Sequence, residues 1–207
     1  MPLVVAGTFS EEFTKSRTAF AVAIHERKLR MKISEVRTNI GTWDASGIFN
    51  RETYTKNLLD FKSILDQYGV RFFLAFGTLL GAVRENGFIE GDTDTDLFVT
   101  EEENEKLAQA VSSQKFADAR FKIIRIIYDE IITVSRNDAY IDVSVFSKIP
   151  GGMMIVLNQH TIKEYMVREA QKITFLGQEF LIPKDVESYL TDKYGDWKTK
   201  SGRHATT

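Results

Sequence analysis

The chain has 207 residues, with 27 lysines and arginines against 29 aspartates and glutamates, and a formal net charge of −2. This length fits one compact domain or a domain with an appendage, and the charge gives no general attraction to nucleic acid or to an anionic membrane. The chain has no cysteine, so disulfides and thiolate metal sites are excluded, which fits a reducing cytoplasm.

Targeting and membrane signals are not recognisable in the sequence. The first ten residues, MPLVVAGTFS, lack a basic start and a long apolar core, so no signal peptide is expected. No apolar run approaches the length of a membrane span. The histidines His25, His160 and His204 are far apart, so a histidine-built zinc site is not expected. The expected location is therefore the cytoplasm, and a peripheral contact at the inner face of the membrane stays open.

The first 50 residues are expected to form a helical extension and a loop. Residues 11–30 carry apolar side chains on one side and basic side chains at the end, where these suit the helix dipole. Residues 38–50 contain glycine breakers and are expected to be a connecting loop. The basic end of the helix could contact phosphate or a membrane, but a solvated helix end is the favoured interpretation.

The clearest predicted helix covers residues 51–68, because its apolar side chains recur at helical spacing. Gly69 fits the left-handed position that often follows a helix. Further helices are predicted at residues 78–84, 101–111 and 183–194, with Gly195 after the last. Strands are predicted at residues 70–75, 94–100, 121–128, 131–135, 139–146, 153–157, 172–175 and 179–182. This order favours an α+β domain over residues 51–200, followed by a flexible tail at 201–207.

An acidic stretch is the most informative part of the sequence. From Glu85 to Glu105 there are nine acidic residues and no lysine or arginine. Such a density of like charge is costly unless a cation offsets it, so the stretch indicates a metal-dependent reaction.

Asp94 and Asp96 lie two residues apart in a predicted strand, so both side chains leave the same face, roughly 6.5–7 Å apart along the chain. The predicted strand at residues 139–146 places Asp142 in the same way. If the two strands are neighbours, the carboxylates converge, and without a paired base they hold cations or stay protonated. Oxygen ligands of this kind suit magnesium or manganese. The alternative is an acidic loop that leads into an exposed strand.

Gly77 and Thr78 lie where a strand is expected to give way to a helix. Backbone N–H groups at such a place can hold phosphate, and glycine allows a close approach. The alternative is a simple helix cap by Thr78. Arg84 could bind donor phosphates with two hydrogen bonds, or it could neutralise Glu85 or Glu90. We favour the functional interpretation of both features.

Two stretches resemble the signature of a known family. FGTLLGAVRENGFIEGDTDTDLFV, residues 76–99, is similar to the G-T-L-L-G-x-x-R, G-F-I and acidic D-x-D pattern of the LicD family, which fukutin and the fukutin-related protein share. FLGQEFLIPKDVESYLTDKYGDW, residues 175–197, is similar to the terminal pattern of that family. Together with IDVSVF, residues 141–146, these stretches cover less than half of the chain but lie in the order of the family.

The resemblance implies a nucleotidyltransferase-like fold of the polymerase-beta type, with a mixed sheet and flanking helices. The implied site residues are the helix-start pair Gly77 and Thr78, the family arginine Arg84, and the metal carboxylates Asp94, Asp96 and Asp142. The sequence departs from the family pattern at Glu90-Gly91, where Pro-Trp is frequent, and at Thr93, where an acid is frequent. These departures leave the metal pair in place and the identity of the donor open.

The function that the resemblance favours is a LicD-type phosphotransferase with Mg²⁺ or Mn²⁺. Such an enzyme moves phosphocholine or a polyol phosphate from a CDP-linked donor to a hydroxyl of a free or lipid-linked glycan precursor, as in lipopolysaccharide or capsule biosynthesis. One alternative is a nucleotidyltransferase that attaches a nucleoside monophosphate to a small molecule or a protein. Another is a binding domain with a relic site, which the intact Asp94, Asp96 and Asp142 disfavour.

Overall fold

The computed structural model describes residues 50–127, 130–154 and 160–200. The helix predicted at residues 11–30, nearly all of the loop at 38–50 and the tail at 201–207 lie outside these ranges. Among the described helices, none combines the length and the apolar character needed to cross a membrane.

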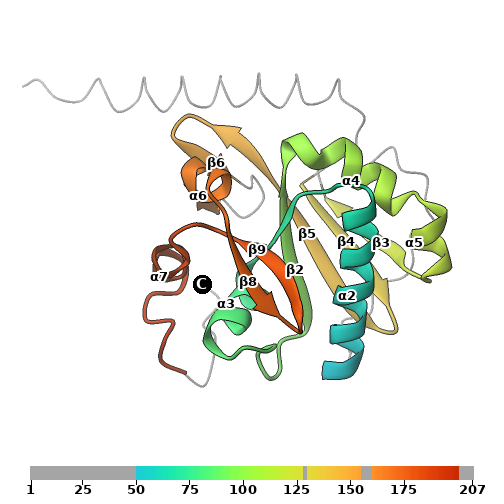
Figure 1. Ribbon diagram of the computed structural model, residues 1–207, viewed down its shortest axis with the longest axis horizontal. Helices are drawn as coiled ribbons and strands as arrows, with labels where there is room; N and C mark the ends of the chain where they lie inside the picture. The colour runs from blue at the N-terminus through green and yellow to red at the C-terminus, as the bar shows by residue number, and fades with distance from the viewer. Residues whose placement is uncertain (1–49, 128–129, 155–159, 201–207) are drawn as a thin grey trace, which may run out of the picture.

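A mixed β-sheet forms the centre of the domain (Figure 1). Its main path runs in the order β3-β4-β5-β2-β1-β9-β8, and β6 pairs with β5 and with β7. β2 is parallel to β5 and β1 is parallel to β9, while the other described pairs are antiparallel. The strands are β1 (Phe72–Leu74), β2 (Asp94–Thr100), β3 (Lys122–Ile127), β4 (Ile131–Arg136), β5 (Ala139–Ile149), β6 (Gly152–Met154), β7 (Thr161–Ile162), β8 (Gln171–Phe175) and β9 (Gln178–Ile182).

The helices are α2 (Arg51–Gln67), α3 (Phe76–Arg84), α4 (Asn104–Val111), α5 (Gln114–Asp118), α6 (Glu164–Arg168) and α7 (Val186–Tyr194). The predicted helix at residues 101–111 is divided into a 3₁₀ turn, Glu101–Glu103, and α4. The short elements α5, α6 and β7 were not predicted, because five or fewer residues carry too little periodicity to be recognised. The observed mixture of helices and a mixed sheet confirms the predicted α+β class.

Helix α2 forms as its sequence predicts. The side chain of Asn50 caps its start by accepting a hydrogen bond from the backbone N–H of Thr53 at 3.0 Å. Gly69 follows its end with φ +63°, the left-handed conformation that glycine adopts without strain. The residues that α2 buries are Tyr54, Asn57, Leu58, Phe61, Ile64 and Leu65.

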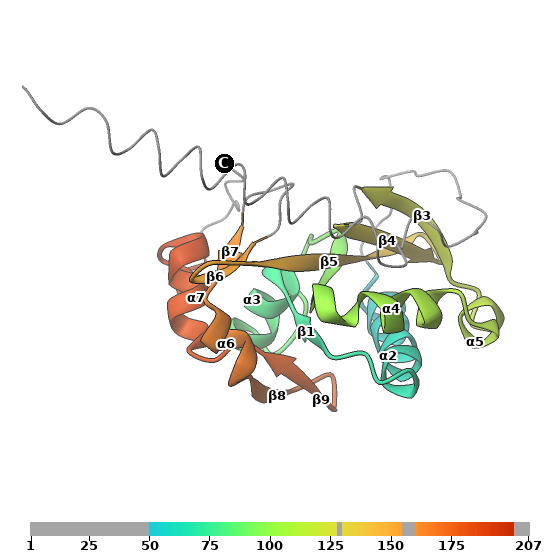
Figure 2. The same ribbon diagram turned by 90° about the horizontal axis from the view of Figure 1, so that it is seen from above.

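Two groups of helices lie at different places on the sheet. Figure 2 shows α2, α4 and α5 together on one side, while α7 lies at the other end of the domain, near α3 and α6. The buried side chains Thr95 and Leu97 of β2 and Ile141 and Val143 of β5 belong to one apolar face of the sheet. Because side chains alternate along a strand, Asp94, Asp96 and Asp142 leave the opposite face.

A buried arginine fixes α2 and α5 to the sheet. The side chain of Arg136, at the end of β4, donates to Oδ1 of Asn57 at 2.8 Å and to Oδ2 of Asp60 at 2.8 Å, both on α2. It also donates to the backbone carbonyl of Ala119, just after α5, at 3.1 Å. Its guanidinium carbon lies 4.2 Å from the ring centre of Phe121. Buried arginine is stable only with such partners, so these contacts specify how the helices dock.

Candidate active site

A row of polar side chains crosses four neighbouring strands. Asp96 of β2 lies beside Asp142 of β5, Asp142 lies beside Thr133 of β4, and Thr133 lies beside Arg125 of β3. Neighbouring strands are separated by about 4.8 Å, so adjacent members of the row are in contact range. The expectation that the Asp94–Asp96 strand and the Asp142 strand are neighbours is therefore confirmed.

Asp142 has a basic partner, which the sequence did not reveal. Arg125 donates through its Nη2 to Oδ2 of Asp142 at 3.1 Å, and the Thr133 hydroxyl donates to Oδ1 of Asp142. Arg125 also donates through Nε to the Thr133 oxygen at 3.0 Å. The expectation that all three carboxylates lack a paired base is therefore wrong for Asp142. The pairing depends on strand register across the sheet, and no local spacing in the sequence encodes it.

Asp92 joins the site, although it was not among the predicted site residues. It lies in the loop before β2, and its carboxyl is hydrogen-bonded to that of Asp94. A β-carbon on Gly77 would collide with the Asp92 carboxylate and would lie 3.4 Å from Oδ2 of Asp96. The signal that could have found Asp92 is its place in the acidic stretch, two residues before Asp94. We call Asp92, Asp94, Asp96 and Asp142 the carboxylate cluster.

Burial and mutual repulsion hold part of the carboxylate cluster in the protonated form. The pKa of Asp94 is raised to about 7, first by burial and then by the charges of Asp92 and Asp142. Burial and the charges of Asp94 and Asp92 raise the pKa of Asp96 well above its usual range. Burial also raises the pKa of Asp92. A bound cation would replace the protons, because it offsets the same repulsion.

The start of α3 holds Asp96 from two sides. The backbone N–H of Gly77 donates to Oδ2 of Asp96 at 3.1 Å, and the buried Thr78 hydroxyl oxygen accepts from the backbone N–H of Asp96 at 2.8 Å. Ala75 is the N-cap residue, so the alternative in which Thr78 caps the helix is wrong. The helix also begins at Phe76, with φ +39°, two residues earlier than predicted. The role of Gly77 and Thr78 in binding donor phosphate stays a prediction.

Arg84 makes the contacts expected of a structural residue. Its Nη2 lies 2.7 Å from Oε1 of Glu85, and its Nη1 donates to the carbonyl of Trp197 at 3.2 Å. Its side chain is 9% exposed and that of Glu85 is 17% exposed, so this ion pair is largely shielded from water. Lys200 adds a second base 3.3 Å from Glu85. These contacts fit the alternative in which Arg84 neutralises Glu85, while donor binding by Arg84 stays a prediction.

Replacing Arg84 by lysine separates these two interpretations. If Arg84 holds donor phosphates, Arg84→Lys should weaken donor use by roughly 1–3 kcal/mol, because lysine cannot make the paired hydrogen bonds. If Arg84 is structural, donor kinetics should stay normal and the melting temperature should fall. The measurement is donor kcat/KM together with melting curves for Arg84→Lys and Arg84→Ala. Normal donor kinetics in the lysine variant would leave donor binding to the carboxylate cluster and the start of α3.

The carboxylate cluster fits a divalent cation by its chemistry. Carboxylate oxygens are the ligands that magnesium and manganese prefer, and buried like charges are offset by a cation or by protons. In the described residues, however, no set of three acidic or histidine side chains is already arranged as metal ligands. Asp92 is hydrogen-bonded to Asp94, Asp96 accepts from Gly77, and Asp142 is paired with Arg125. A metal bound here would therefore require these side chains to rotate out of their present contacts.

A tyrosine of α2 holds the loop that carries the acids. The hydroxyl of Tyr54 donates to the backbone carbonyl of Thr93 at 2.6 Å. Burial, followed by the charges of Asp94 and Asp92, raises the pKa of Tyr54 to about 12. The phenol therefore stays a hydrogen-bond donor at neutral pH, and it fixes the backbone between the two aspartates.

Comparisons with known proteins give both a structural likeness and a family. The chain resembles the crystal structure of ANT(2″)-Ia in complex with adenylyl-2″-tobramycin, with 12% identity, coverage of 68% of this chain and 78% of that chain, and a TM-score of 0.46. It also resembles the solution structure of the antibiotic-resistance factor ANT(2″)-Ia (11% identity, 73% and 79% coverage, TM-score 0.48). A third likeness is to the crystal structure of the lincosamide antibiotic adenylyltransferase LnuA, lincomycin-bound. The identity is 13%, the match covers 65% of this chain and 82% of that chain, and the TM-score is 0.46. TM-scores below 0.5 support no conclusion about function.

The comparison with curated proteins found no match. The family model described as "LicD/FKTN/FKRP, nucleotidyltransferase domain" matches residues 69–185, which is more than half of the chain. The matched range includes all of the carboxylate cluster, the start of α3 and Arg84, and it confirms the resemblance read from the sequence. The chain therefore belongs to the LicD family and carries its nucleotidyltransferase domain.

Proposed function

We propose that the protein is a metal-dependent phosphotransferase. It moves a phosphocholine-like group or a polyol phosphate from a CDP-linked donor to a hydroxyl of a surface glycan precursor, free or lipid-linked, and releases CMP. The observation that supports this proposal is the carboxylate cluster, which strand register and α3 bring together at one place. Membership of the LicD family supports a transferase in general. The location that suits such a precursor is the cytoplasm or the inner face of the membrane.

The residues of the cluster have different roles in this reaction. Asp94, Asp96 and Asp142, assisted by Asp92, would hold Mg²⁺ or Mn²⁺, which would supply charge compensation for the transferred phosphate and for the leaving nucleotide. Asp142 accepts the proton of the acceptor hydroxyl, and its hydrogen bonds with Thr133 and Arg125 hold its carboxylate in one orientation. Because Gly77 has no side chain, the Asp92 and Asp96 carboxylates lie close to the backbone at the start of α3, where donor phosphate would meet the metal.

The second candidate is transfer of a nucleoside monophosphate, and the family description "nucleotidyltransferase domain" favours it. The same carboxylates would serve, because the two reactions differ only in which phosphorus atom is attacked. The two reactions can be distinguished by the leaving group. Phosphotransfer from a CDP-linked donor releases CMP, whereas nucleotidyl transfer from a nucleoside triphosphate releases pyrophosphate.

The decisive experiment combines a binding screen with product analysis. CDP-choline, CDP-glycerol and CDP-ribitol, and the nucleoside triphosphates, are tested by thermal shift with magnesium or manganese. ³¹P NMR then follows each stabilising compound with candidate glycan acceptors. Release of CMP supports the proposal, and release of pyrophosphate supports the second candidate. If no nucleotide stabilises the protein and none is consumed, both functions are contradicted.

Metal binding should depend on Asp142. Divalent metal should raise the melting temperature more in the wild type than in Asp142→Asn, because a ligand that binds the native state adds stability by mass action. The matched control is Asp118→Asn, which changes an exposed aspartate at the end of α5. The control should keep the full metal-dependent shift. Equal shifts in the wild type and in Asp142→Asn would remove Asp142 from the metal site and leave it as the proton acceptor alone.

A further inference from the structure

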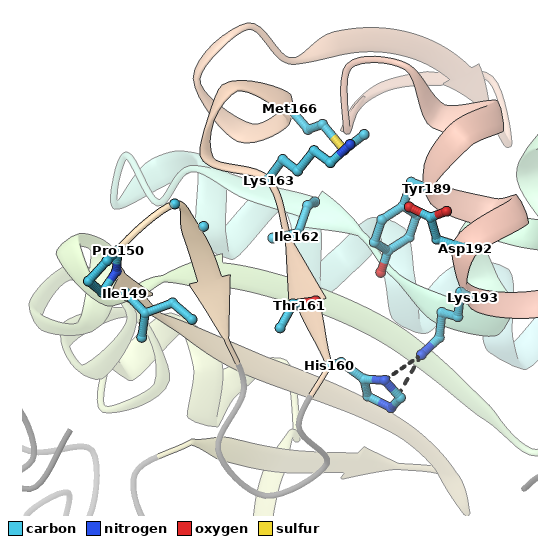
Figure 3. A pocket seen from close by; sticks show the side chains of 12 residues that line it. Ile149, Pro150, His160, Thr161, Ile162, Lys163, Met166, Tyr189, Asp192 and Lys193 are labelled. Carbon is cyan, nitrogen blue, oxygen red and sulfur yellow. Dashed lines mark hydrogen bonds between the residues drawn. The ribbon is translucent and has the colours of Figure 1, made fainter. Parts of the chain in front are cut away.

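A pocket with a volume of about 480 Å³ lies between the turn after β5, β7, α6 and α7 (Figure 3). Ile149, Ile162 and Met166 give it apolar walls, and α7 contributes Tyr189, Asp192 and Lys193. Tyr189 and Lys193 are four residues apart in a helix, so both side chains leave the same side of α7. Neither the carboxylate cluster nor the start of α3 lines this pocket, so the proposed reaction does not yet account for it.

Lys193 places a positive charge at one end of the pocket. Its half-buried Nζ lies 3.2 Å from Nδ1 of His160 (Figure 3). The same Nζ lies 4.0 Å from the ring centre of Phe76. Within the described ranges, no carboxylate lies within ion-pair distance of this Nζ. Burial of a cation costs free energy, and contact with aromatic rings offsets this cost only in part. Lys193 is therefore a half-buried cation at the pocket wall, placed to contact an anionic group of a ligand.

This end of the pocket adjoins the carboxylate cluster. Phe76, whose ring contacts Lys193, directly precedes Gly77, and the N–H of Gly77 donates to Asp96 at 3.1 Å. The charge of Asp96 also reaches α7, since it raises the pKa values of Tyr189, Lys193 and Tyr194. An anion that contacts Lys193 would therefore lie beside the place where metal and phosphate are proposed to bind.

We propose that Lys193 and His160 form an anion subsite, which binds a phosphate group of a substrate that extends from the carboxylate cluster into the pocket. The ammonium supplies the charge, and the imidazole of His160 fixes its position. The inference rests on the proposed function for its role in transfer, although binding of the anion itself does not depend on that function. The apolar walls then contact the part of the substrate beyond the phosphate.

The protonation states of His160 and Lys193 suit the binding of an anion. Burial and the nearby Lys193 lower the pKa of His160, so the imidazole is neutral at pH 7 and can accept a hydrogen bond from the ammonium. Burial lowers the pKa of Lys193 to about 8, partly opposed by Asp96, so lysine keeps most of its charge at pH 7. The structural alternative is that Lys193 only packs on Phe76 and Tyr194, the ring centres of which lie 4.0 and 5.6 Å away.

The test uses inorganic phosphate as the probe and His160 as the reporter. The chain has three histidines, so the imidazole signals are few in NMR spectra, and His160→Gln identifies those of His160. Phosphate is titrated into the full chain with a chelator present and the ionic strength held constant with chloride. The wild type should show a saturable shift of the His160 signals. Lys193→Gln should weaken phosphate binding by about tenfold or more, the scale of a lost charged hydrogen bond.

Two matched variants make the result specific. Lys163→Gln removes an exposed lysine that lines the same pocket and should change phosphate affinity little. Lys193→Arg keeps the charge and should keep binding, which covers the case in which Lys193→Gln folds poorly. Absence of a saturable shift in the wild type, or equal losses in Lys163→Gln and Lys193→Gln, would overturn the subsite.

Two further experiments test the anion subsite independently of the proposed transfer reaction. Asp94→Asn should bind phosphate at His160 even if it transfers nothing, so failure of the proposed function leaves the subsite intact. Addition of CMP distinguishes the source of the phosphate. If CMP competes with phosphate at His160, the subsite serves the donor. If both bind together, it serves a phosphate on the acceptor or on the transferred group.

Discussion

Asp94→Asn and Asp96→Asn should each reduce transfer by about 10³-fold or more, because each removes a charged oxygen from the proposed metal site. Asparagine keeps the shape of the side chain, and in Asp96→Asn the amide oxygen can still accept the hydrogen bond of the Gly77 N–H. The loss should therefore appear in kcat at saturating metal and donor. Near-normal turnover in either variant at saturating metal would contradict a metal site built on this pair.

The same substitutions should leave the metal-free fold intact or stabilise it. Repulsion within the carboxylate cluster is present only in the folded state, and asparagine relieves it. Asp94 has a pKa of about 7 in the folded protein against an ordinary value of 3.8. The unfolded chain releases this proton first, so the wild type should lose stability as the pH rises from about 4 to about 7. Above about pH 7 both states are ionised, and this group causes no further change.

Denaturant unfolding at several pH values, with a chelator present, measures this effect. The wild type should show the decline, and Asp94→Asn should show a flatter profile over the same range. Divalent metal should also flatten the wild-type profile, because it binds the ionised carboxylates. If the free energy of unfolding of the wild type rises between pH 4 and pH 7, repulsion among the carboxylates does not destabilise the folded protein.

Arg136→Ala should destabilise the fold by about 3–5 kcal/mol, the cost of removing one partner from a buried charged network. The substitution removes one donor each from the Asn57 amide oxygen and from the backbone carbonyls of Lys56 and Ala119. Asp60 is 37% exposed, so water can compensate its loss in part. Most of the cost therefore arises from the buried acceptors. The free energy of unfolding in denaturant gives the value.

Lys56→Ala is the matched control for Arg136→Ala. Lys56 also contacts Asp60, at 2.9 Å, but its side chain is 69% exposed, and such pairs contribute about 1 kcal/mol or less. If the two variants lose similar stability, the docking of α2 does not depend on the network around Arg136. A large loss only in Arg136→Ala would identify this arginine as the anchor of α2 and α5.

Local patterns in the sequence were sufficient to predict most of the helices and strands. Helical spacing predicted α2, and alternation predicted β2 with Asp94 and Asp96 on one face, because side-chain direction in a single helix or strand follows from backbone geometry alone. The same alternation in β5 placed Asp142 correctly. The LicD signature consists of these local features, so the sequence alone carries the resemblance to the family.

The tertiary structure alone decided which side chains meet across the sheet and between distant segments. Strand register brings Arg125 beside Asp142. Arg136 of β4 donates a hydrogen bond to Asn57 of α2, and Lys193 of α7 contacts His160. These partners are separated by 17, 79 and 33 residues, so no local periodicity links them. The sequence determined which faces carry charge. Only chain folding determined which charges are paired, because pairing depends on the packing of elements that are remote along the chain.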